Sequence, residues 1–210
     1  MNRSYISITG TMGVGKSTLT ERLSKELGYA AFFEEFAENI FLPRFYKNKK
    51  RWAFHSQTYF LINKMEQLVE IKKLKKNIVQ DSFLAADIAS YVQAQYELGY
   101  MEKAEWALYR RLYGLKKDDL PEPNLIVFLT ASTPAIFDRI KKRKRTYETN
   151  HGKQSLLRYL EVLQRLNRGW IDKMKNRCRV VEVDTTAQNY FADKTEWAKL
   201  VAKIKAYEKI

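Results

Sequence analysis

The sequence predicts an α/β fold built on a five-stranded parallel sheet with helices on both faces. Two observations predict it. Short apolar or β-branched runs take turns with helical patterns along the chain, and strands that alternate with helices form parallel sheets. A glycine-rich turn also joins the first apolar run to the first helical pattern, which is where such sheets bind phosphate groups.

The strand candidates are five runs, at residues 5–9, 30–33, 77–80, 125–130 and 180–183. Ligands of a parallel sheet bind beyond the carboxyl ends of its strands. Glu34, Asp81 and Asp184 follow three of these runs. We therefore expect their carboxylates at one rim of the sheet.

Helical patterns fill the intervals between the strand candidates. The first helix starts near Lys16, carries leucines at four-residue spacing and ends at Gly28, a residue suited to a helix C-cap. Residues 52–75 form the clearest pattern, with apolar side chains on one face. Thr133 and Pro134 open a later helix as its N-cap and its first residue.

The composition is that of a single domain over residues 1–210. Hydrophobic residues make up 45% of the chain, enough for a sizeable core, and eight Gly and four Pro argue against a flexible linker. The single cysteine excludes an internal disulfide. One cysteine and two histidines are also too few for a usual zinc site. We find no signal peptide and no apolar stretch of membrane length, so we expect a cytoplasmic protein without a membrane partner.

Residues 10–17 read GTMGVGKS and match the full phosphate-loop pattern G-x-x-x-x-G-K-[ST]. The glycines let the backbone fold around an anion with its N–H groups pointing inward, and the helix that follows adds its positive dipole end. We expect Lys16 to reach the β- and γ-phosphates of a nucleotide and the Ser17 hydroxyl to bind Mg²⁺. A glycine turn beside an ordinary lysine is the alternative, and the flanking strand and helix argue against it.

Two of the rim carboxylates suit phosphate chemistry. Glu34 lies where the γ-phosphate of a nucleotide would be, and a carboxylate there can accept the proton of an attacking hydroxyl. Asp81 has the position of an acid that helps to hold Mg²⁺. The alternatives are structural: Glu34 or Glu35 could cap the turn that follows, and Asp81 could cap a helix that begins near Ser82.

The chain carries a formal net charge of +14, which attracts polyanions without selecting nucleic acid, membranes or small phosphate compounds. The lysines at 72–76 suit a solvated helix face. The run at 139–145 is denser, because only Ile140 in it is uncharged. We expect a lid at about residues 143–153 whose arginines close over ATP, with a solvated helix end or a nucleic-acid patch as alternatives.

Together, four segments resemble a known family. They are the phosphate loop, EEFAENIFL at 34–42, the stretch from FY at 45–46 through RWAFHSQ at 51–57, and RKR at 143–145. Over residues 5–184 the chain resembles the bacterial-type deoxyribonucleoside kinases, the group of deoxyadenosine, deoxyguanosine and deoxycytidine kinases. The resemblance implies a P-loop kinase fold and transfer of the γ-phosphate of ATP to the 5′-hydroxyl of a deoxynucleoside in nucleotide salvage.

The resemblance also implies roles for individual residues. Catalysis would fall to Lys16, Glu34, Arg143 and Arg145. ATP would be held by Gly10, Gly13, Val14, Gly15, Lys16, Ser17, Thr18, Arg139 and Arg143, and Mg²⁺ by Ser17 and Asp81. The deoxynucleoside would be bound by Glu34 as proton acceptor, Tyr46 and Glu148 at the 3′-hydroxyl, and Gln57, Lys64 and Asp87 around the base. Phe36, Trp52, Phe83 and Tyr91 could wall the base or belong to the core.

Two positions depart from the family pattern. Ser82 follows Asp81 where many members carry arginine, and Lys64 replaces an arginine on the helix of Gln57. Lysine lacks the bidentate fork of arginine, so the contacts of Lys64 should differ from those of the family. General likeness favours purine bases, and family members pair helices like those at 52–75 and 82–114 across a two-fold axis. We therefore expect a homodimer and no nucleic-acid partner.

Two other functions fit parts of the sequence. A nucleoside monophosphate kinase of the thymidylate kinase type shares the phosphate loop, the sheet and a basic lid, but needs cations for the phosphate of its acceptor. A nucleotide-dependent nucleic-acid-binding protein would use the net charge of +14. The aromatic residues follow helical core spacing and do not interleave with the basic run, which argues against the second alternative.

Overall fold

The computed structural model describes residues 3–143, 145–149, 152–187 and 190–208. Its centre is a sheet of five parallel strands in the order β2-β3-β1-β4-β5. The strands are β1 (Tyr5–Thr9), β2 (Ala30–Phe32), β3 (Ile78–Asp81), β4 (Leu125–Thr130) and β5 (Arg179–Asp184). The predicted fold class is confirmed. The observed limits differ from the predicted ones by one residue at one end of β2 and at both ends of β3 and β5.

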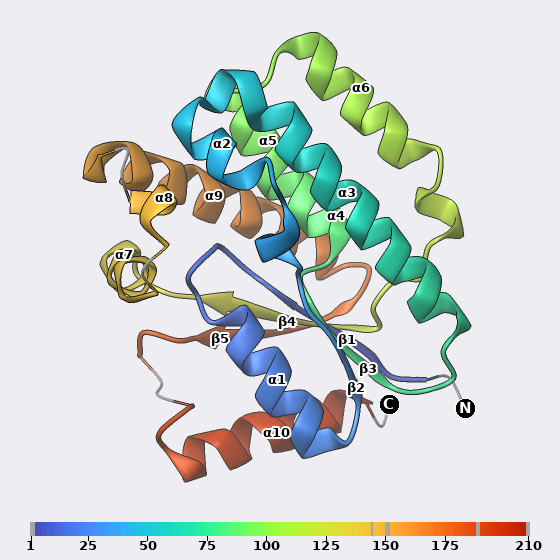
Figure 1. The fold of residues 1–210 in the computed structure, drawn as a ribbon. Helices are drawn as coiled ribbons and strands as arrows, with labels where there is room; N and C mark the ends of the chain where they lie inside the picture. The colour runs from blue at the N-terminus through green and yellow to red at the C-terminus, as the bar shows by residue number, and fades with distance from the viewer. Residues whose placement is uncertain (1–2, 144, 150–151, 188–189, 209–210) are drawn as a thin grey trace.

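Helices cover both faces of the sheet (Figure 1). One face carries α1 (Lys16–Leu27) and α10 (Lys194–Glu208), and the other carries α3 (Lys49–Lys73), α5 (Gln93–Glu97), α6 (Lys103–Gly114) and α9 (Lys153–Met174). The shorter segments are η1 (Phe36–Glu38), α2 (Leu42–Lys47), α4 (Leu84–Asp87), the π-helical turn η2 (Ile88–Val92), η3 (Lys117–Asp119), α7 (Thr133–Lys142) and α8 (Thr146–Thr149).

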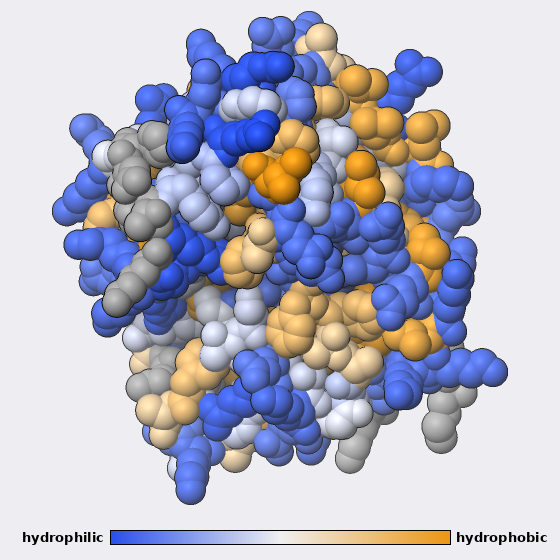
Figure 2. Space-filling model, in the orientation of Figure 1, coloured by the Kyte–Doolittle hydropathy of each residue, from blue (hydrophilic) through white to orange (hydrophobic). Residues whose placement is uncertain are grey.

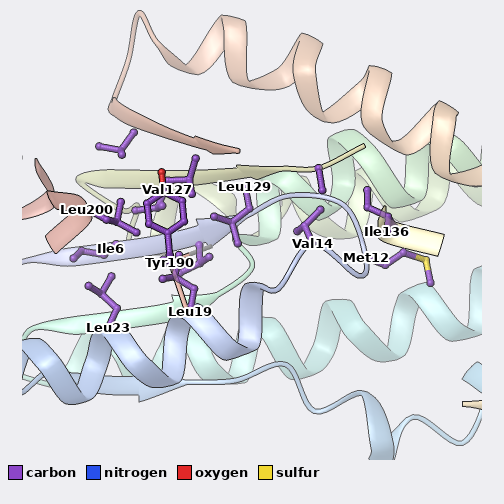
Figure 3. Close-up of a cluster of buried hydrophobic side chains, with 14 of the residues drawn as sticks. Ile6, Met12, Val14, Leu19, Leu23, Val127, Leu129, Ile136, Tyr190 and Leu200 are labelled. Atoms are coloured by element: carbon purple, nitrogen blue, oxygen red, sulfur yellow. The ribbon is translucent and has the colours of Figure 1, made fainter. Parts of the chain in front are cut away.

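The phosphate loop is anchored in the core. Buried residues of β1, β4 and α1 pack together, and the same cluster continues to Met12 and Val14 of the loop and to Ile136 of α7 (Figure 3). A second cluster, on the side of α3 and α6, contains Tyr46 and Tyr109. The loop therefore sits between a packed sheet and a packed helix, which fixes its shape.

The phosphate-loop helix starts at Lys16 and is followed by Gly28 in a left-handed conformation (φ 69°), as predicted. Two other predicted boundaries need correction. The helix predicted at 52–75 is α3, which begins at Lys49 because the Asn48 side chain accepts a hydrogen bond from the Arg51 N–H. The N-cap of α7 is Ser132, whose hydroxyl accepts a hydrogen bond from the N–H of Ala135, so Thr133 and Pro134 each lie one position further into the helix than predicted.

The stretch predicted as helical at 82–114 is two units. The first comprises α4, η2 and α5, and it ends before Gly99, which has a positive φ of 68°. The second is α6, which begins with a capping box between Glu102 and Glu105. A left-handed glycine followed by this capping pair separates the two units, and both signals are present in the sequence.

Candidate active site

A cavity of about 500 Å³ opens at the carboxyl ends of β1, β2 and β3. Nearly all the residues predicted to act line it: Gly13, Val14, Gly15, Lys16, Ser17, Thr18, Glu34, Tyr46, Gln57, Lys64, Asp81, Asp87, Arg139, Arg143, Arg145 and Glu148. Gly10 lies outside this lining, and a Cβ there would meet the Leu129 carbonyl oxygen at 2.5 Å. The structure therefore brings residues from six regions of the sequence to one place.

The phosphate loop has the conformation of an anion cradle. Gly13 and Gly15 have positive φ angles of 80° and 103°, and Lys16 is the first residue of α1. The first turn of α1 contains no acidic residue, so no carboxylate within it neutralises the positive end of the helix dipole. A Cβ on Gly13 would lie 3.0 Å from Ile140 and 3.1 Å from Ile136. The backbone of the loop thus depends on glycine both for its conformation and for space.

Ser17 and Asp81 fit a magnesium ion bound to phosphates. The Ser17 hydroxyl donates a hydrogen bond to Asp81 Oδ2 at 2.5 Å, while the buried Oδ1 finds no hydrogen-bond partner among the described residues. Mg²⁺ commonly uses one or two carboxylates together with substrate phosphates and water. Asp81 does not cap the following helix, because α4 begins at Leu84 with Phe83 as its N-cap.

The structure distinguishes Glu34 from Glu35. Glu34 is half-buried and lines the cavity, whereas Glu35 is exposed and lies outside the lining. Glu35 occupies the N-cap position of η1 but makes no side-chain capping bond. Asp184, the third rim carboxylate, accepts hydrogen bonds from the N–H groups of Thr186 and Ala187 and does not line the cavity. Of these carboxylates, only Glu34 joins Asp81 in the cavity.

The basic run is divided between two roles. Its first part belongs to α7, where Arg139 donates hydrogen bonds to Thr185 and to the Val14 carbonyl. Arg143, at the end of α7, pairs with Glu148 through two hydrogen bonds of 2.7 Å. Arg145 Nη1 lies 3.6 Å from Glu148, and its guanidinium lies over the Phe36 ring. The described part of the predicted lid is thus an arginine pair on a buried carboxylate, while residues 144 and 150–151 lie outside the described residues.

The two departures from the family meet at the end of β3. The buried Lys64 ammonium donates hydrogen bonds to the carbonyl oxygens of Asp81 and Ser82. Ser82 has a positive φ of 66°, the only described residue other than glycine that does, and its hydroxyl donates a hydrogen bond to Asp87. Burial, followed by the negative charge of Glu34, raises the pKa of Asp87 to about 7.

Polar and aromatic side chains form the rest of the wall. Gln57 is 6% exposed, and no described residue forms a hydrogen bond with its amide. The Tyr46 hydroxyl lies near Met12, and burial, then the charge of Glu148, raises the pKa of Tyr46. Of the four aromatic candidates, Phe36 and Tyr91 line the cavity, and Trp52 and Phe83 do not.

Sequence reasoning missed several lining residues. Gln95 stands four residues after Tyr91 and eight after Asp87, a helical spacing that could have revealed it. Tyr159 and Phe191 come from α9 and from the segment after β5, and no local pattern marks either residue. Phe191 is 41% exposed and lies 3.8 Å from the place of a Cβ on Gly15.

Within the described ranges, no helix combines the length and the apolar character needed to cross a membrane. The surface in Figure 2 is mostly hydrophilic, with apolar side chains gathered on the side of α3 and α6. Exposed apolar residues of that side include Ile62, Val69, Leu108 and Leu115.

Comparison with known proteins gives consistent results. A family model described as deoxynucleoside kinase matches residues 6–208. The deoxyadenosine/deoxycytidine kinase of Bacillus subtilis is 30% identical over 203 residues, which are 96% of this chain and 91% of that protein. The deoxyguanosine kinase of the same organism is 28% identical over 207 residues, or 96% of each chain.

Solved structures extend this likeness to three dimensions. The deoxyadenosine kinase from M. mycoides with products dCMP and a flexible dCDP bound has a TM-score of 0.82 and 28% identity, covering 96% of this chain and 99% of that one. A structure of that enzyme with bound dATP has a TM-score of 0.81 and 29% identity at the same coverage.

Proposed function

The chain belongs to the deoxynucleoside kinase family, and from that premise we propose how its own residues carry out the transfer of the γ-phosphate of ATP to the 5′-hydroxyl of a deoxynucleoside. One observation carries the proposal. Glu34, the phosphate loop and the Ser17–Asp81 pair face the same cavity, so a proton acceptor, a phosphate cradle and a metal site share one space.

The donor side is formed by the phosphate loop. The backbone N–H groups of residues 13–18 and the Lys16 ammonium hold the phosphates of ATP. Ser17 and Asp81 would hold Mg²⁺, which when bound neutralises phosphate charge. Arg139 stabilises the conformation of the loop, because it donates hydrogen bonds both to the Val14 carbonyl and to the Thr185 hydroxyl. We therefore assign Arg139 mainly to the shape of the loop.

On the acceptor side, Glu34 takes the proton of the 5′-hydroxyl while that oxygen forms its bond to the γ-phosphorus. The bond between the γ-phosphorus and the β–γ bridging oxygen breaks, and ADP leaves. Arg143 and Arg145 stabilise the charge on the transferring group. The carboxylate needs only to be within hydrogen-bond reach of the hydroxyl, and its position at the rim beside the phosphate loop supports this role.

The cationic side chains of the cavity bear on whether the acceptor carries a phosphate of its own. A monophosphate acceptor needs cations for its own phosphate. In the described cavity, Lys64 is bound to two carbonyl groups. Arg143 and Arg145 are already assigned to the transferring phosphate, so none of these three cations is left for a second phosphate. This supports an uncharged nucleoside as the acceptor. Gln57 and Asp87 supply hydrogen-bonding groups for its base, and Tyr46 and Glu148 groups for its sugar.

We propose purine deoxynucleosides as the preferred substrates, on general likeness to the family. Relatives named for deoxyadenosine, deoxycytidine and deoxyguanosine are about equally similar to this chain. Phosphorylation of the four deoxynucleosides and their ribose counterparts tests the preference. A higher kcat/KM for deoxycytidine or thymidine than for either purine would contradict it.

The Glu34→Gln variant tests the central assignment. We expect kcat to fall about 10²- to 10⁴-fold, because the amide cannot accept the proton, while ATP binding and the unfolding midpoint stay near the wild type. The matched control is Glu35→Gln, since Glu35 is exposed outside the cavity. Similar rates for the two variants would remove Glu34 from the mechanism.

We further propose a homodimer that pairs the faces of α3 and α6. Ile62 and Val69 lie seven residues apart on α3, and Leu108 and Leu115 lie seven apart at α6 and its end, so each pair marks one side of a helix. All four side chains are about half exposed or more, which is the pattern of a surface covered by another copy. The cytoplasmic location, the single domain and the absence of a nucleic-acid partner stay predictions.

A further inference from the structure

Two side chains of α3, about one helical turn apart, hold the main chain at the ends of two neighbouring strands. Lys64 donates hydrogen bonds to the carbonyl oxygen of Asp81, at the end of β3, and to that of the residue after it. Gln67, three residues further along α3, donates a hydrogen bond of 2.6 Å from Nε2 to the carbonyl oxygen of Phe33. Residues three apart lie on the same face of a helix. This face of α3 therefore contacts the main chain beside both carboxylates of the proposed reaction, Asp81 and Glu34.

The Phe33 carbonyl lies just beyond the reach of strand pairing. The register between β2 and β3 ends with Phe32 opposite Gln80, and β2 pairs with no other described strand. The Phe33 carbonyl belongs to the peptide group that joins Phe33 to Glu34, and such a group is planar. The hydrogen bond from Gln67 therefore fixes the plane from which the Glu34 side chain extends, at a place where the sheet does not.

The amide of Gln67 is oriented by a chain of hydrogen bonds from the core. The Tyr5 hydroxyl donates to Gln80 Oε1, and Gln80 Nε2 donates over 3.4 Å to Gln67 Oε1. Tyr5 and Gln80 are 2% and 0% exposed. A carbonyl oxygen only accepts hydrogen bonds, so Nε2 of Gln67 must face Phe33, and this sets the direction of each bond back to Tyr5 as the first donor. Burial raises the pKa of Tyr5, so the first donor keeps its proton.

We propose that Gln67 is a positioning residue, whose hydrogen bond to the Phe33 carbonyl keeps the Glu34 carboxylate within reach of the 5′-hydroxyl. The inference rests on the proposed function and deepens it, because Gln67 has this role only if Glu34 accepts the proton. Gln67 does not line the cavity, so it acts through Glu34 and not on a substrate. Its loss should lower kcat and leave the KM values for ATP and for the nucleoside nearly unchanged.

The experiment measures Gln67→Met in two backgrounds, on the deoxynucleoside that the wild type phosphorylates best. Methionine resembles glutamine in length but has no N–H group for the Phe33 carbonyl. In the wild-type background we expect kcat to fall about 10- to 100-fold, because a reacting group misplaced by about 1 Å costs about that much. In the Glu34→Gln background, which lacks the proton acceptor, the same substitution should change kcat by less than about twofold. An equal fall in both backgrounds, or no fall in the wild-type background, would overturn the proposal.

Gln67→Lys separates positioning from stability. Lysine restores a donor for the Phe33 carbonyl, as Lys64 does for two other carbonyl groups, but it cannot accept the hydrogen bond of Gln80. We expect Gln67→Lys to recover most of the kcat that Gln67→Met loses, while the urea midpoints of both variants stay below that of the wild type. A kcat that merely follows the urea midpoint would show that Gln67 is structural only, and would overturn the proposal.

Gln164→Met is the matched control. Gln164 is partly buried like Gln67, and its Nε2 donates a hydrogen bond of 2.7 Å to the carbonyl oxygen of Ala131, the residue after β4. No residue proposed to act adjoins Ala131 in the sequence, so this variant should lose stability and keep its kcat. Equal losses of kcat in Gln164→Met and Gln67→Met would overturn the proposal. A wild type that phosphorylates no nucleoside, or a Glu34→Gln variant with full kcat, would instead overturn the proposed function, and with it this inference.

Discussion

Lys64 shows how one residue can keep its charge and change its task. Its ammonium is buried against the Asp81 and Ser82 carbonyl oxygens, with no carboxylate within ion-pair distance among the described residues. An arginine at this position would present a planar fork, which suits a carboxylate or a base edge. The lysine instead supports the backbone turn that carries Ser82.

The Lys64→Met variant should therefore lose stability. We expect the free energy of unfolding to fall by about 1–3 kcal/mol, because two buried carbonyl groups lose their donor. Urea denaturation measures the change. Lys73→Met is the control, since Lys73 lies exposed on the same helix and should shift stability by less than about 0.5 kcal/mol. Equal effects of the two substitutions would show that the buried hydrogen bonds of Lys64 contribute nothing.

Asp87 gives the site a dependence on pH. Its pKa rises from 3.8 to about 7 on folding, so the unfolded chain releases this proton at lower pH than the folded chain does. The contribution of Asp87 to the free energy of unfolding therefore falls as pH rises from about 4 to about 7, and is constant above that range.

Asp87→Asn removes this dependence. We expect the unfolding free energy of the wild type, minus that of the variant, to decrease between about pH 4 and about pH 7, measured by urea denaturation in steps of one pH unit. Asp118→Asn, at an exposed position, should show no such trend. A difference that stays flat across the range for Asp87→Asn would contradict the raised pKa.

At the scale of elements, the phosphate loop follows β1 and packs against α7. A Cβ on Gly13 would press on Ile136 and Ile140, and the φ of 80° is unfavourable for any residue with a Cβ. Gly13→Ala should weaken ATP binding by about tenfold or more, since the strain is of the order of 1–3 kcal/mol. Calorimetric titration of Mg·ATP measures it.

Gly169→Ala is the control for this substitution. Gly169 is exposed inside α9 with open space around the position of a Cβ. Alanine there should raise the free energy of unfolding by about 0.5–1 kcal/mol and leave ATP affinity unchanged. Unchanged ATP affinity in Gly13→Ala as well would mean that the loop tolerates the strain.

The parts of the site that could be predicted are those with a local signal. The phosphate loop, Glu34 and Asp81 each directly follow an apolar run, and the carboxyl ends of parallel strands meet at one rim. The contacts that could not be predicted are long-range. Arg139 reaches Thr185 across 46 positions, and Gln95 reaches Tyr159 across 64. Such pairs depend on how α7 and α9 pack, which no window of sequence contains.

The predicted helix boundaries were wrong where a capping side chain sets the start of the helix. Asn48 and Ser132 cap α3 and α7 through their own hydrogen bonds, and each moves the start of its helix away from the predicted residue. The division between α5 and α6 was missed although Gly99 and the Glu102–Glu105 pair mark it. Hydrophobic periodicity alone continues across such a break, because both helices pack on the same layer.

For the molecule as a whole, the proposed dimer explains the apolar side of α3 and α6. Ile62→Lys and Leu108→Lys, at 51% and 48% exposure, should convert a particle near twice 24.8 kDa into the monomer. A charge buried in an interface without a partner weakens association. Sedimentation equilibrium measures the mass. Ile40→Lys, at 63% exposure and outside both helices, should leave the dimer intact, and a monomeric wild type at micromolar concentration would contradict the prediction.

The order of the strands has a consequence for how the protein fails when it is warmed. Among the described strands, β2 has three residues, lies at the edge of the sheet and pairs only with β3. β1, which leads into the phosphate loop, has a neighbour on each side. Fraying begins where a strand is short and has one neighbour. Glu34 directly follows β2, so warming should abolish phosphoryl transfer at a lower temperature than it abolishes ATP binding. A partly unfolded molecule would then bind ATP without transferring its phosphate.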